Sequence, residues 1–277
     1  MENIFRPATN VHAPRFGDGA PVILLHGSAS GSSQWRSMVG CLEGRFKVMT
    51  PDLPGYGKSA SRVAMRGLTM EEIARAVLPV IEREGRPAHL VGHSFGGAVA
   101  LKLASMFPGH VNSLTLIEPA AFSLIADQMN QLPFMRAVRS SRLALAEGDA
   151  WNSMRLFIDF WNGDGAWNRT SHGLRQRLAA MAGRVQRDIE AVVSDRFTEQ
   201  DAAGVACPTL VLTGEDSPPD MGRIVAALEA TIPFLRTEVI PGAGHMAPLT
   251  DPHVVDPMVG GFIAKVEFGW QGLSIAA

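Results

Sequence analysis

A serine and a histidine of this chain stand in settings that suit nucleophilic catalysis. Ser94 is the centre of GHSFG at 92–96, which fits the G-x-S-x-G pattern of a serine on a tight turn between a strand and a helix. A serine hydroxyl is a poor nucleophile at neutral pH until a base removes its proton. Among the eight histidines, His245 is best placed as that base, in the glycine-rich run PGAGHMAP at 241–248. We therefore expect Ser94 to attack and His245 to act as the general base.

The residues around Ser94 support the turn. The strand-like run AHLV at 88–91 precedes it, and the small residues GAVA at 97–100 open a helix where that helix must approach a sheet. The two glycines of GHSFG are predicted to be steric requirements, because side chains there would clash with the neighbouring strand and helix.

The other histidines are assigned packing or surface roles. His26 and His93 lie inside motifs where we expect the backbone to matter more than the ring. The remaining five are predicted to be surface or packing residues: His12, His89, His110, His172 and His253.

Acyl transfer also needs two N–H donors for the oxyanion of the tetrahedral intermediate. The backbone N–H of Phe95, at the start of the helix after Ser94, is one expected donor. The second is assigned to the N–H of Ser28, in HGS at 26–28, which follows the first core strand.

Short apolar runs that end in turn residues predict buried parallel strands. Helical patterns lie between them at 70–84, which opens with a Thr69–Glu72 capping box, at 98–106, and from Asp251 onward. Alternating strands and helices predict an α/β fold with a mostly parallel, doubly wound sheet. The strands are expected at 22–25, 46–49, 89–91, 114–117, 210–212 and 239–240.

The alternation stops between residues 121 and 200, which contain helix-like segments and no convincing strand. We predict that 121–200 is an inserted helical cap, or lid, and that 1–120 and 201–277 together form the core. Aromatic residues concentrate in this insertion, and Phe157, Trp161 and Trp167 are candidates for the substrate pocket. A pocket lined by them would be apolar and would suit a hydrophobic acyl or aryl group.

Composition excludes several functions. The 25 Lys and Arg against 27 Asp and Glu give a net charge of −2, so neither nucleic acid nor a membrane surface is an expected partner. No apolar run is long enough for a signal peptide or a membrane span, which predicts a soluble, cytoplasmic protein. Two cysteines and the absence of nucleotide-binding motifs predict no metal and no cofactor. The oligomeric state is not indicated.

Four motifs in this order resemble the α/β-hydrolase fold family, in particular its capped group of esterases, carbon–carbon bond hydrolases and cofactor-free haloperoxidases. They are HGS at 26–28, DLPGYGKS at 52–59, GHSFGG at 92–97 and GAGHMAPL at 242–249. The resemblance spans nearly the whole chain and implies the same catalytic and oxyanion roles for Ser94, His245, Phe95 and Ser28. Epoxide hydrolases and haloalkane dehalogenases resemble this group but have aspartate at the nucleophile position.

The third member of a catalytic triad is ambiguous. Most relatives resemble G-x-x-D after the penultimate strand, whereas GEDS at 214–217 has serine at the aspartate position and Asp216 one place early. The alternative is Glu118, which precedes Pro119 at the end of an earlier strand and resembles the acid position of pancreatic-type lipases. Both carboxylates remain candidates for holding the imidazole tautomer.

These residues predict a cofactor-free serine hydrolase that cleaves a small or medium carboxylic ester through an acyl-enzyme. A carbon–carbon bond hydrolase and a perhydrolase are alternatives that would use the same triad. A non-catalytic ligand-binding module of the same fold is the alternative from another class, because this fold also serves in receptors.

Overall fold

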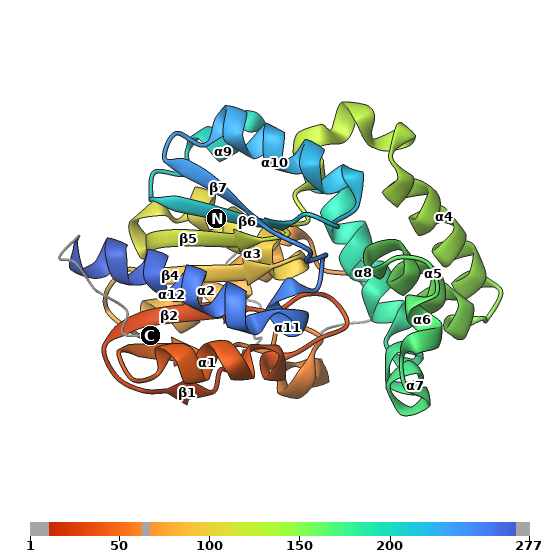
Figure 1. Cartoon of the computed structure of the whole chain (residues 1–277), viewed down its shortest axis with the longest axis horizontal. Coiled ribbons are helices and arrows are strands. Elements are labelled where there is room, and N and C mark those ends of the chain that lie inside the picture. The colour runs from red at the N-terminus through yellow and green to blue at the C-terminus, as the bar shows by residue number, and fades with distance from the viewer. Residues whose placement is uncertain (1–10, 63–66, 270–277) are drawn as a thin grey trace, which may run out of the picture.

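The computed structural model describes residues 11–62 and 67–269, and these form one twisted seven-stranded sheet with the order β1-β3-β2-β4-β5-β6-β7 (Figure 1). All neighbouring strands are parallel except β1 and β3. The predicted α/β fold is therefore confirmed. The strands are β1 (Arg15–Phe16), β2 (Ala20–Leu25), β3 (Phe46–Met49), β4 (Ala88–His93), β5 (Val111–Ile117), β6 (Thr209–Gly214) and β7 (Leu235–Ile240).

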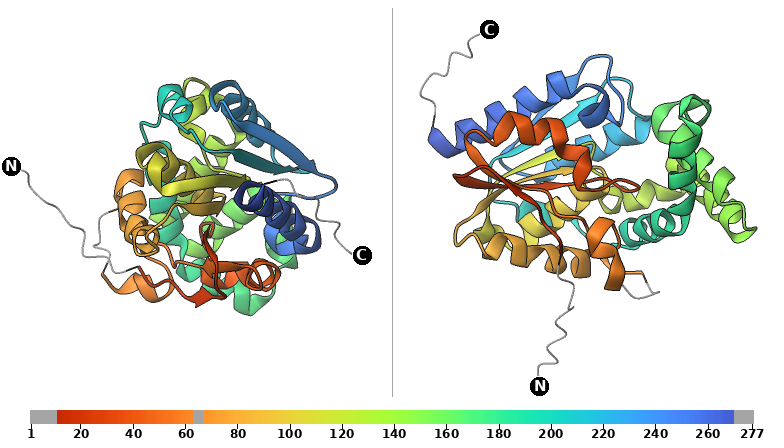
Figure 2. Two further views of the ribbon diagram at one scale, coloured as in Figure 1. Left: turned by 90° about the vertical axis from the view of Figure 1, so that its left-hand side faces the viewer. Right: turned by 90° about the horizontal axis from the view of Figure 1, so that it is seen from below.

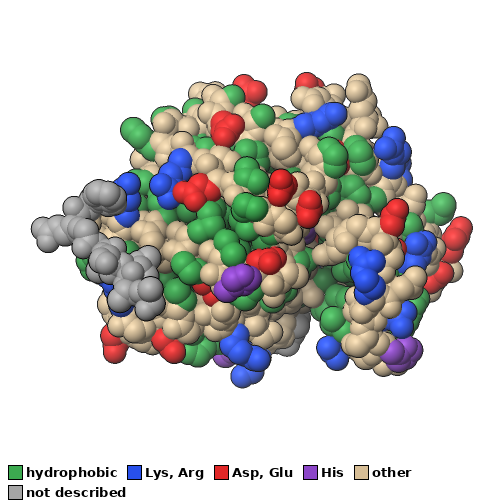
Figure 3. Space-filling model, in the orientation of Figure 1, with side chains coloured by type: hydrophobic (Ala, Val, Ile, Leu, Met, Phe, Trp, Pro, Cys, Tyr) green, Lys and Arg blue, Asp and Glu red, His purple; other side chains and the backbone are tan. Residues whose placement is uncertain are grey.

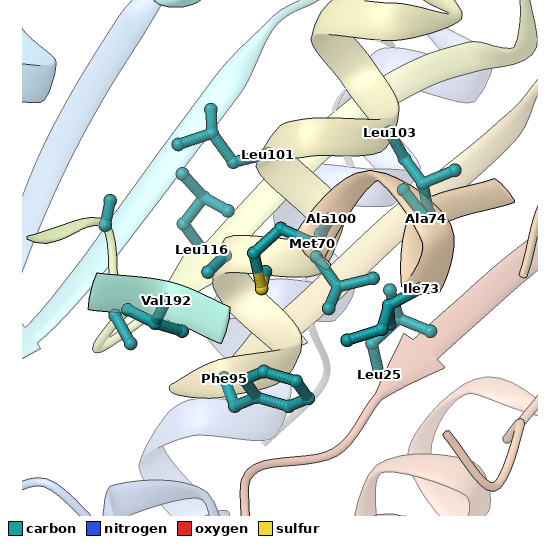
Figure 4. Packing of buried hydrophobic residues seen from close by; sticks show 14 of the residues in the cluster. Leu25, Met70, Ile73, Ala74, Phe95, Ala100, Leu101, Leu103, Leu116 and Val192 are labelled. Atoms are coloured by element: carbon teal, nitrogen blue, oxygen red, sulfur yellow. The ribbon is translucent and has the colours of Figure 1, made fainter. Parts of the chain in front are cut away.

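Helices cover both faces of this sheet and bury two apolar clusters. One cluster lies under α2 (Met70–Glu82), α3 (Phe95–Met106) and α10 (Pro219–Thr231), and the other under α1 (Arg36–Leu42) and α12 (Pro252–Phe268). Figure 4 shows part of the first cluster, where Phe95, Met70 and Leu116 approach one another from α3, α2 and β5. Burial on both faces explains why the central strands are continuous apolar runs.

Five of the predicted strands begin earlier than expected or end later, while the strand at 46–49 has the predicted bounds. The capping box of Thr69 and Glu72 opens α2 as predicted. Three α-helices of the core had no prediction: α1, α10 and the short α11 (Ala247–Thr250). The two-residue strand β1 also had none, because both its side chains are exposed and it carries no apolar pattern.

The segment between β5 and β6, here called the helical insertion, contains no strand. Its helices between residues 133 and 193 lie beyond one end of the sheet, whereas its last helix, Glu199–Ala203, packs on α3 and α10 of the core (Figures 1 and 2). Basic and acidic side chains are interspersed over the insertion on the face drawn in Figure 3. Its helices are η4 (Phe122–Gln131), α4 (Pro133–Ala146), α5 (Ala150–Asn162), α6 (Ala166–Arg169), α7 (His172–Ala180), α8 (Ala182–Val193) and α9 (Glu199–Ala203).

The smaller helices of the core are η1 (Ser32–Trp35), η2 (Gly57–Arg62), η3 (Pro108–His110) and α11 (Ala247–Thr250). Across the described ranges 11–62 and 67–269, no helix has the length and apolar character needed to cross a bilayer.

Candidate active site

Ser94 lies directly after the central strand β4 and before α3, in a backbone conformation that few side chains adopt. Its φ of 53° and ψ of −117° fall outside the ordinary regions for a non-glycine residue. The turn is tight: a Cβ added at Gly92 would come within 2.3 Å of the Gly96 carbonyl oxygen, and one at Gly96 within 2.2 Å of the Leu25 carbonyl oxygen. Only glycine fits at either position. The two glycines therefore permit the tight turn on which Ser94 is placed.

A continuous chain of hydrogen bonds joins Ser94, His245 and Glu118. The Ser94 hydroxyl lies 3.0 Å from His245 Nε2, and His245 Nδ1 lies 3.1 Å from Glu118 Oε2. Ser94, His245 and Glu118 are 8%, 3% and 0% exposed, and they follow β4, β7 and β5. Because parallel strands end at one edge of the sheet, residues far apart in sequence meet there.

Glu118 is fixed by more partners than the histidine. Its Oε1 accepts hydrogen bonds from the Thr213 hydroxyl at 2.9 Å, the Gly214 N–H at 2.7 Å and the Ser217 hydroxyl at 2.8 Å. Burial by itself would raise the pKa of Glu118, but the hydrogen bonds and the nearby His245 outweigh it and hold the pKa below its usual range. The ionised carboxylate can only accept, so His245 Nδ1 donates to it and Nε2 accepts from Ser94.

The backbone at Glu118 is also unusual, with φ at +51°. Residues held in the left-handed region without being glycine cost about 1–3 kcal/mol and concentrate at functional sites. Ser94 and Glu118, which follow hydrogen-bonded neighbouring strands, share this property.

Asp216, the other candidate for the acid, is exposed, and its side chain makes no hydrogen bond or ion pair with His245. Its backbone N–H donates to the Ala243 carbonyl. Ser217, which stands at the position of the family aspartate, instead donates its hydroxyl to Glu118. The structure thus brings Glu118, and not Asp216, to the imidazole.

The loop at 27–29 leaves one donor free. The N–H of its first residue donates to Gln34 Oε1, the N–H of its last residue donates to the Tyr56 hydroxyl, and the Ser28 hydroxyl donates to Asp188. Within the described part of the chain, the backbone N–H groups of Ser28 and Phe95 donate to no other protein group. Both residues line the same cavity as Ser94.

The rings of His26 and His93 do more than the sequence suggested. His26 Nδ1 donates to the Gly27 carbonyl and its Nε2 accepts from the Leu53 N–H, while desolvation lowers the pKa of His26 to about 4. His93 Nε2 donates to the His245 carbonyl at 2.8 Å and its Nδ1 accepts from Gln34. Both rings are thereby held neutral, since each needs one nitrogen as an acceptor. Composition and spacing gave no signal for these bonds, which depend on tertiary contacts.

A small cavity of about 20 Å³ adjoins Ser94. Aromatic residues of the helical insertion form much of its wall, and the Trp161 ring stacks on the His245 imidazole with 3.8 Å between centroids and 21° between planes. Phe157 also lines the cavity. Trp167 does not: it is buried against Trp151, with ring centroids 5.4 Å apart. The cavity is lined by Ser28, Ser94, Phe95, Ala120, Phe122, Phe134, Phe157, Trp161, Asp188, Ile189 and Val192.

Comparisons with known proteins identify the family of this chain. The chain matches the model of the alpha/beta hydrolase family over residues 22–257. It is 43% identical over 101 residues to a pimeloyl-[acyl-carrier protein] methyl ester esterase of Methylococcus capsulatus, covering 36% of this chain and 37% of that protein. It is 35% identical over 130 residues to a 2-hydroxy-6-oxo-6-phenylhexa-2,4-dienoate hydrolase of Burkholderia cepacia, covering 44% of each. The match thus spans less than half the length of either relative.

A solved thermophilic esterase from Thermogutta terrifontis has the same fold, with a TM-score of 0.72 and 24% identity, over 92% of this chain and 93% of that one. A serine on a strand–turn–helix elbow above a doubly wound sheet is the arrangement of an α/β-hydrolase. The chain belongs to the alpha/beta hydrolase family. Members of this family that the chain resembles are named as esterases and hydrolases.

Proposed function

We propose that this enzyme hydrolyses a carboxylic ester through an acyl-enzyme on Ser94, with His245 as the general base and Glu118 as the orienting acid. The observation that carries the proposal is the buried chain of hydrogen bonds from Ser94 Oγ through both nitrogens of His245 to Glu118. Three further donors on Glu118 support its role, because they keep the carboxylate ionised and fixed in direction.

The reaction follows from this geometry in two halves. His245 Nε2 takes the proton of Ser94 Oγ as the oxygen bonds to the ester carbonyl carbon, and Glu118 stabilises the imidazolium. His245 then gives that proton to the departing alcohol oxygen as the carbon–oxygen bond breaks, leaving an acyl-enzyme. Water, deprotonated by His245, attacks the acyl carbon and releases the acid and the free serine.

The two free N–H groups supply the stabilisation of the oxyanion in each half. Phe95 and Ser28 line the cavity beside Ser94. Donors fixed before reaction cost no reorganisation when negative charge develops on the carbonyl oxygen. One such donor is worth about 3–4 kcal/mol of transition-state stabilisation.

The substrate carries an apolar acyl or aryl group of small or medium size. Phe122, Phe134, Phe157, Trp161 and Ile189 provide an apolar cavity wall, and the helical insertion acts as a cap over Ser94. Ligand sites usually have about 300–1,000 Å³, so the cap must shift to admit a substrate to a cavity of about 20 Å³. Trp161, which stacks on His245, is the residue of the cavity wall that lies directly on the imidazole.

Carbon–carbon bond hydrolysis is the second candidate, because one relative is named as a 2-hydroxy-6-oxo-6-phenylhexa-2,4-dienoate hydrolase. The two candidates differ in the bond that breaks, and so in the products. Incubation with a phenyl-substituted dienone acid and with a phenyl ester, followed by chromatography of the acids and ketones formed, separates them.

The first test is the intact mass of the protein after treatment with a fluorophosphonate, together with turnover of p-nitrophenyl esters of increasing acyl length. We expect one adduct on the wild type, none on Ser94→Ala, and a fall of about 10⁶-fold in kcat for that variant. The acyl length that gives the highest kcat/KM then indicates the size of acyl group that the pocket accepts.

Ser113→Ala is the matched control. Ser113 is also a buried serine hydrogen-bonded to a histidine, at 2.7 Å from His89 Nδ1, but it lies within β5 and is 0% exposed. This variant should keep both the adduct and the turnover. An adduct that persists on Ser94→Ala, or a wild type that neither reacts nor turns over any ester, would overturn the proposed function.

A further inference from the structure

Helix α8 of the helical insertion reaches into the core with a charged pair. Arg184 Nη2 lies 2.6 Å from Asp188 Oδ1, and the two side chains are 9% and 1% exposed. The Arg184 guanidinium sits over the Tyr56 ring, 5.0 Å from its centroid. Gly55 has a φ of +92°, and a Cβ there would lie 2.4 Å from Arg184 Nη1. The core loop is therefore shaped to receive this arginine.

The second oxygen of the same carboxylate holds the loop at 27–29. Asp188 Oδ2 accepts from the Ser28 hydroxyl at 2.8 Å and from the Tyr56 hydroxyl at 2.5 Å. The Tyr56 oxygen in turn accepts from the Ala29 N–H at 3.0 Å. Asp188 thus contacts the loop directly at the Ser28 hydroxyl and, through Tyr56, at the Ala29 N–H, next to the one free amide, that of Ser28.

The charge of Asp188 is not suited to binding the oxyanion itself. A bare carboxylate beside developing negative charge would raise the energy of the transition state. Here the Arg184 charge and two hydroxyl donors occupy both oxygens. Burial raises the pKa of Asp188, and Arg184 and the hydroxyl groups of Tyr56 and Ser28 oppose that rise. The role that these contacts leave to Asp188 is structural: they fix the position of the loop at 27–29.

Building on the proposed function, we propose that Asp188 is a positioning residue that holds the Ser28 amide on the cavity from the side of the insertion, with Arg184 orienting its carboxylate. The oxyanion site is then complete only while α8 is docked on the core. Docking has an apolar component as well, since Val192 of α8 lies in the core cluster with Phe95 (Figure 4). Formation of the oxyanion site and closure of the insertion become one event.

The test compares variants that loosen this contact with one that breaks a different contact between insertion and core. Tyr56→Phe removes the hydroxyl that links the Ala29 amide to Asp188 and leaves the ion pair with Arg184 intact. Asp188→Asn removes the charge. Asp195→Asn is the matched control, because Asp195 pairs with Lys102 of α3 at 2.8 Å and does not line the cavity beside Ser94.

We expect Tyr56→Phe and Asp188→Asn to lower kcat for a p-nitrophenyl ester and the rate of fluorophosphonate labelling by about 10- to 100-fold. This is below the about 10²- to 10³-fold cost of losing a donor outright. KM should change by less than about threefold, because the amide acts on the transition state more than on the bound ester. Asp195→Asn should match the wild type in all three quantities.

Hydrogen exchange gives a second reading that needs no turnover. Peptides covering 27–29 should exchange faster in Tyr56→Phe and Asp188→Asn than in the wild type, and at the wild-type rate in Asp195→Asn. Unchanged labelling and exchange in Tyr56→Phe would overturn the proposal, even if Asp188→Asn fails to fold. Equal losses in Asp195→Asn would overturn it too, since a general attachment of the insertion would then explain the data. A wild type that is never labelled would instead overturn the proposed function, and the exchange data would still decide the role of Asp188.

Discussion

Two chains of serine, histidine and glutamate lie at opposite ends of the central strands β4 and β5. At the carboxyl edge, Ser94 contacts His245, which contacts Glu118. At the other end of the same strands, the Ser113 hydroxyl lies 2.7 Å from His89 Nδ1, and His89 Nε2 lies 3.2 Å from Glu267 Oε2. The residue types and the distances are nearly the same in both places.

The difference lies in what surrounds each serine. Ser94 has a positive φ, lines a cavity, and adjoins two free amides. Ser113 lies inside β5, paired in register with His89 on β4, and is fully buried. Its histidine joins the strand to Glu267 at the end of α12 and so holds the helix on the sheet. A serine–histidine–glutamate chain therefore only stabilises the fold unless the backbone places the serine hydroxyl at a cavity that can hold a substrate.

Replacing each of the two histidines by glutamine should give opposite results. His245→Gln is expected to lower kcat for ester hydrolysis by about 10⁶-fold, because no base then activates Ser94. His89→Gln should keep kcat within about threefold and lose about 1–3 kcal/mol of unfolding free energy through its broken buried hydrogen bonds. Ester kinetics and urea titrations of both variants provide the measurement. Loss of turnover in both variants, with stability preserved, would contradict the comparison.

The carboxylates should separate in the same way, with a smaller effect. Glu118→Gln is expected to lower kcat by about 10⁴-fold, because an amide in that place no longer enforces the Nδ1–H tautomer of His245. Asp216→Asn and Glu267→Gln serve as controls, and both should stay within about threefold of the wild type. A larger loss for Asp216→Asn than for Glu118→Gln would reassign the orienting acid.

Acid should lower the free energy of unfolding, because the buried neutral histidines near the carboxyl ends of the strands resist protonation. The folded pKa of His26 is about 4 against 6.5 for the free side chain, so the unfolded chain binds more protons between those values and stability falls as the pH drops through them. At pH 5 this single group is expected to cost about 2 kcal/mol relative to pH 7.5. His26→Gln should be less stable at pH 7.5 and show a shallower fall, measured by urea unfolding at both pH values. Parallel curves for the two proteins would contradict the assignment.

Much of the fold was predictable, because its information is local. Apolar runs placed six strands, and the capping box marked the start of α2. The elbow was legible for a similar reason: two glycines and a serine within five residues form a motif whose steric cause lies in one turn. Helix α1 had no such mark in the sequence, and α10 begins with Pro219 but without a side-chain cap.

The parts that escaped prediction depend on contacts between distant segments. Asp216 and Glu118 were equal candidates by sequence, and the choice between them follows from how far each loop extends beyond its strand. The available signal in favour of Glu118 was Ser217. A serine at the position of the family aspartate cannot serve as the acid, and in the structure its hydroxyl donates to Glu118. Trp161 and Trp167 are six residues apart, yet the first stacks on His245 and the second meets the Trp151 ring edge-to-face.

The fit of Arg184 against Gly55 has a consequence for recombining members of this family. The helical insertion is contiguous in sequence, so its two junctions with the core look like natural cut points for building chimaeras. Its true partner surface includes the turn at 53–57, where any side chain at position 55 would meet the guanidinium. A grafted insertion that brings its own α8 must also bring the turn that fits that helix. A chimaera cut only at the two junctions would pair the new α8 with a turn that was not shaped for it.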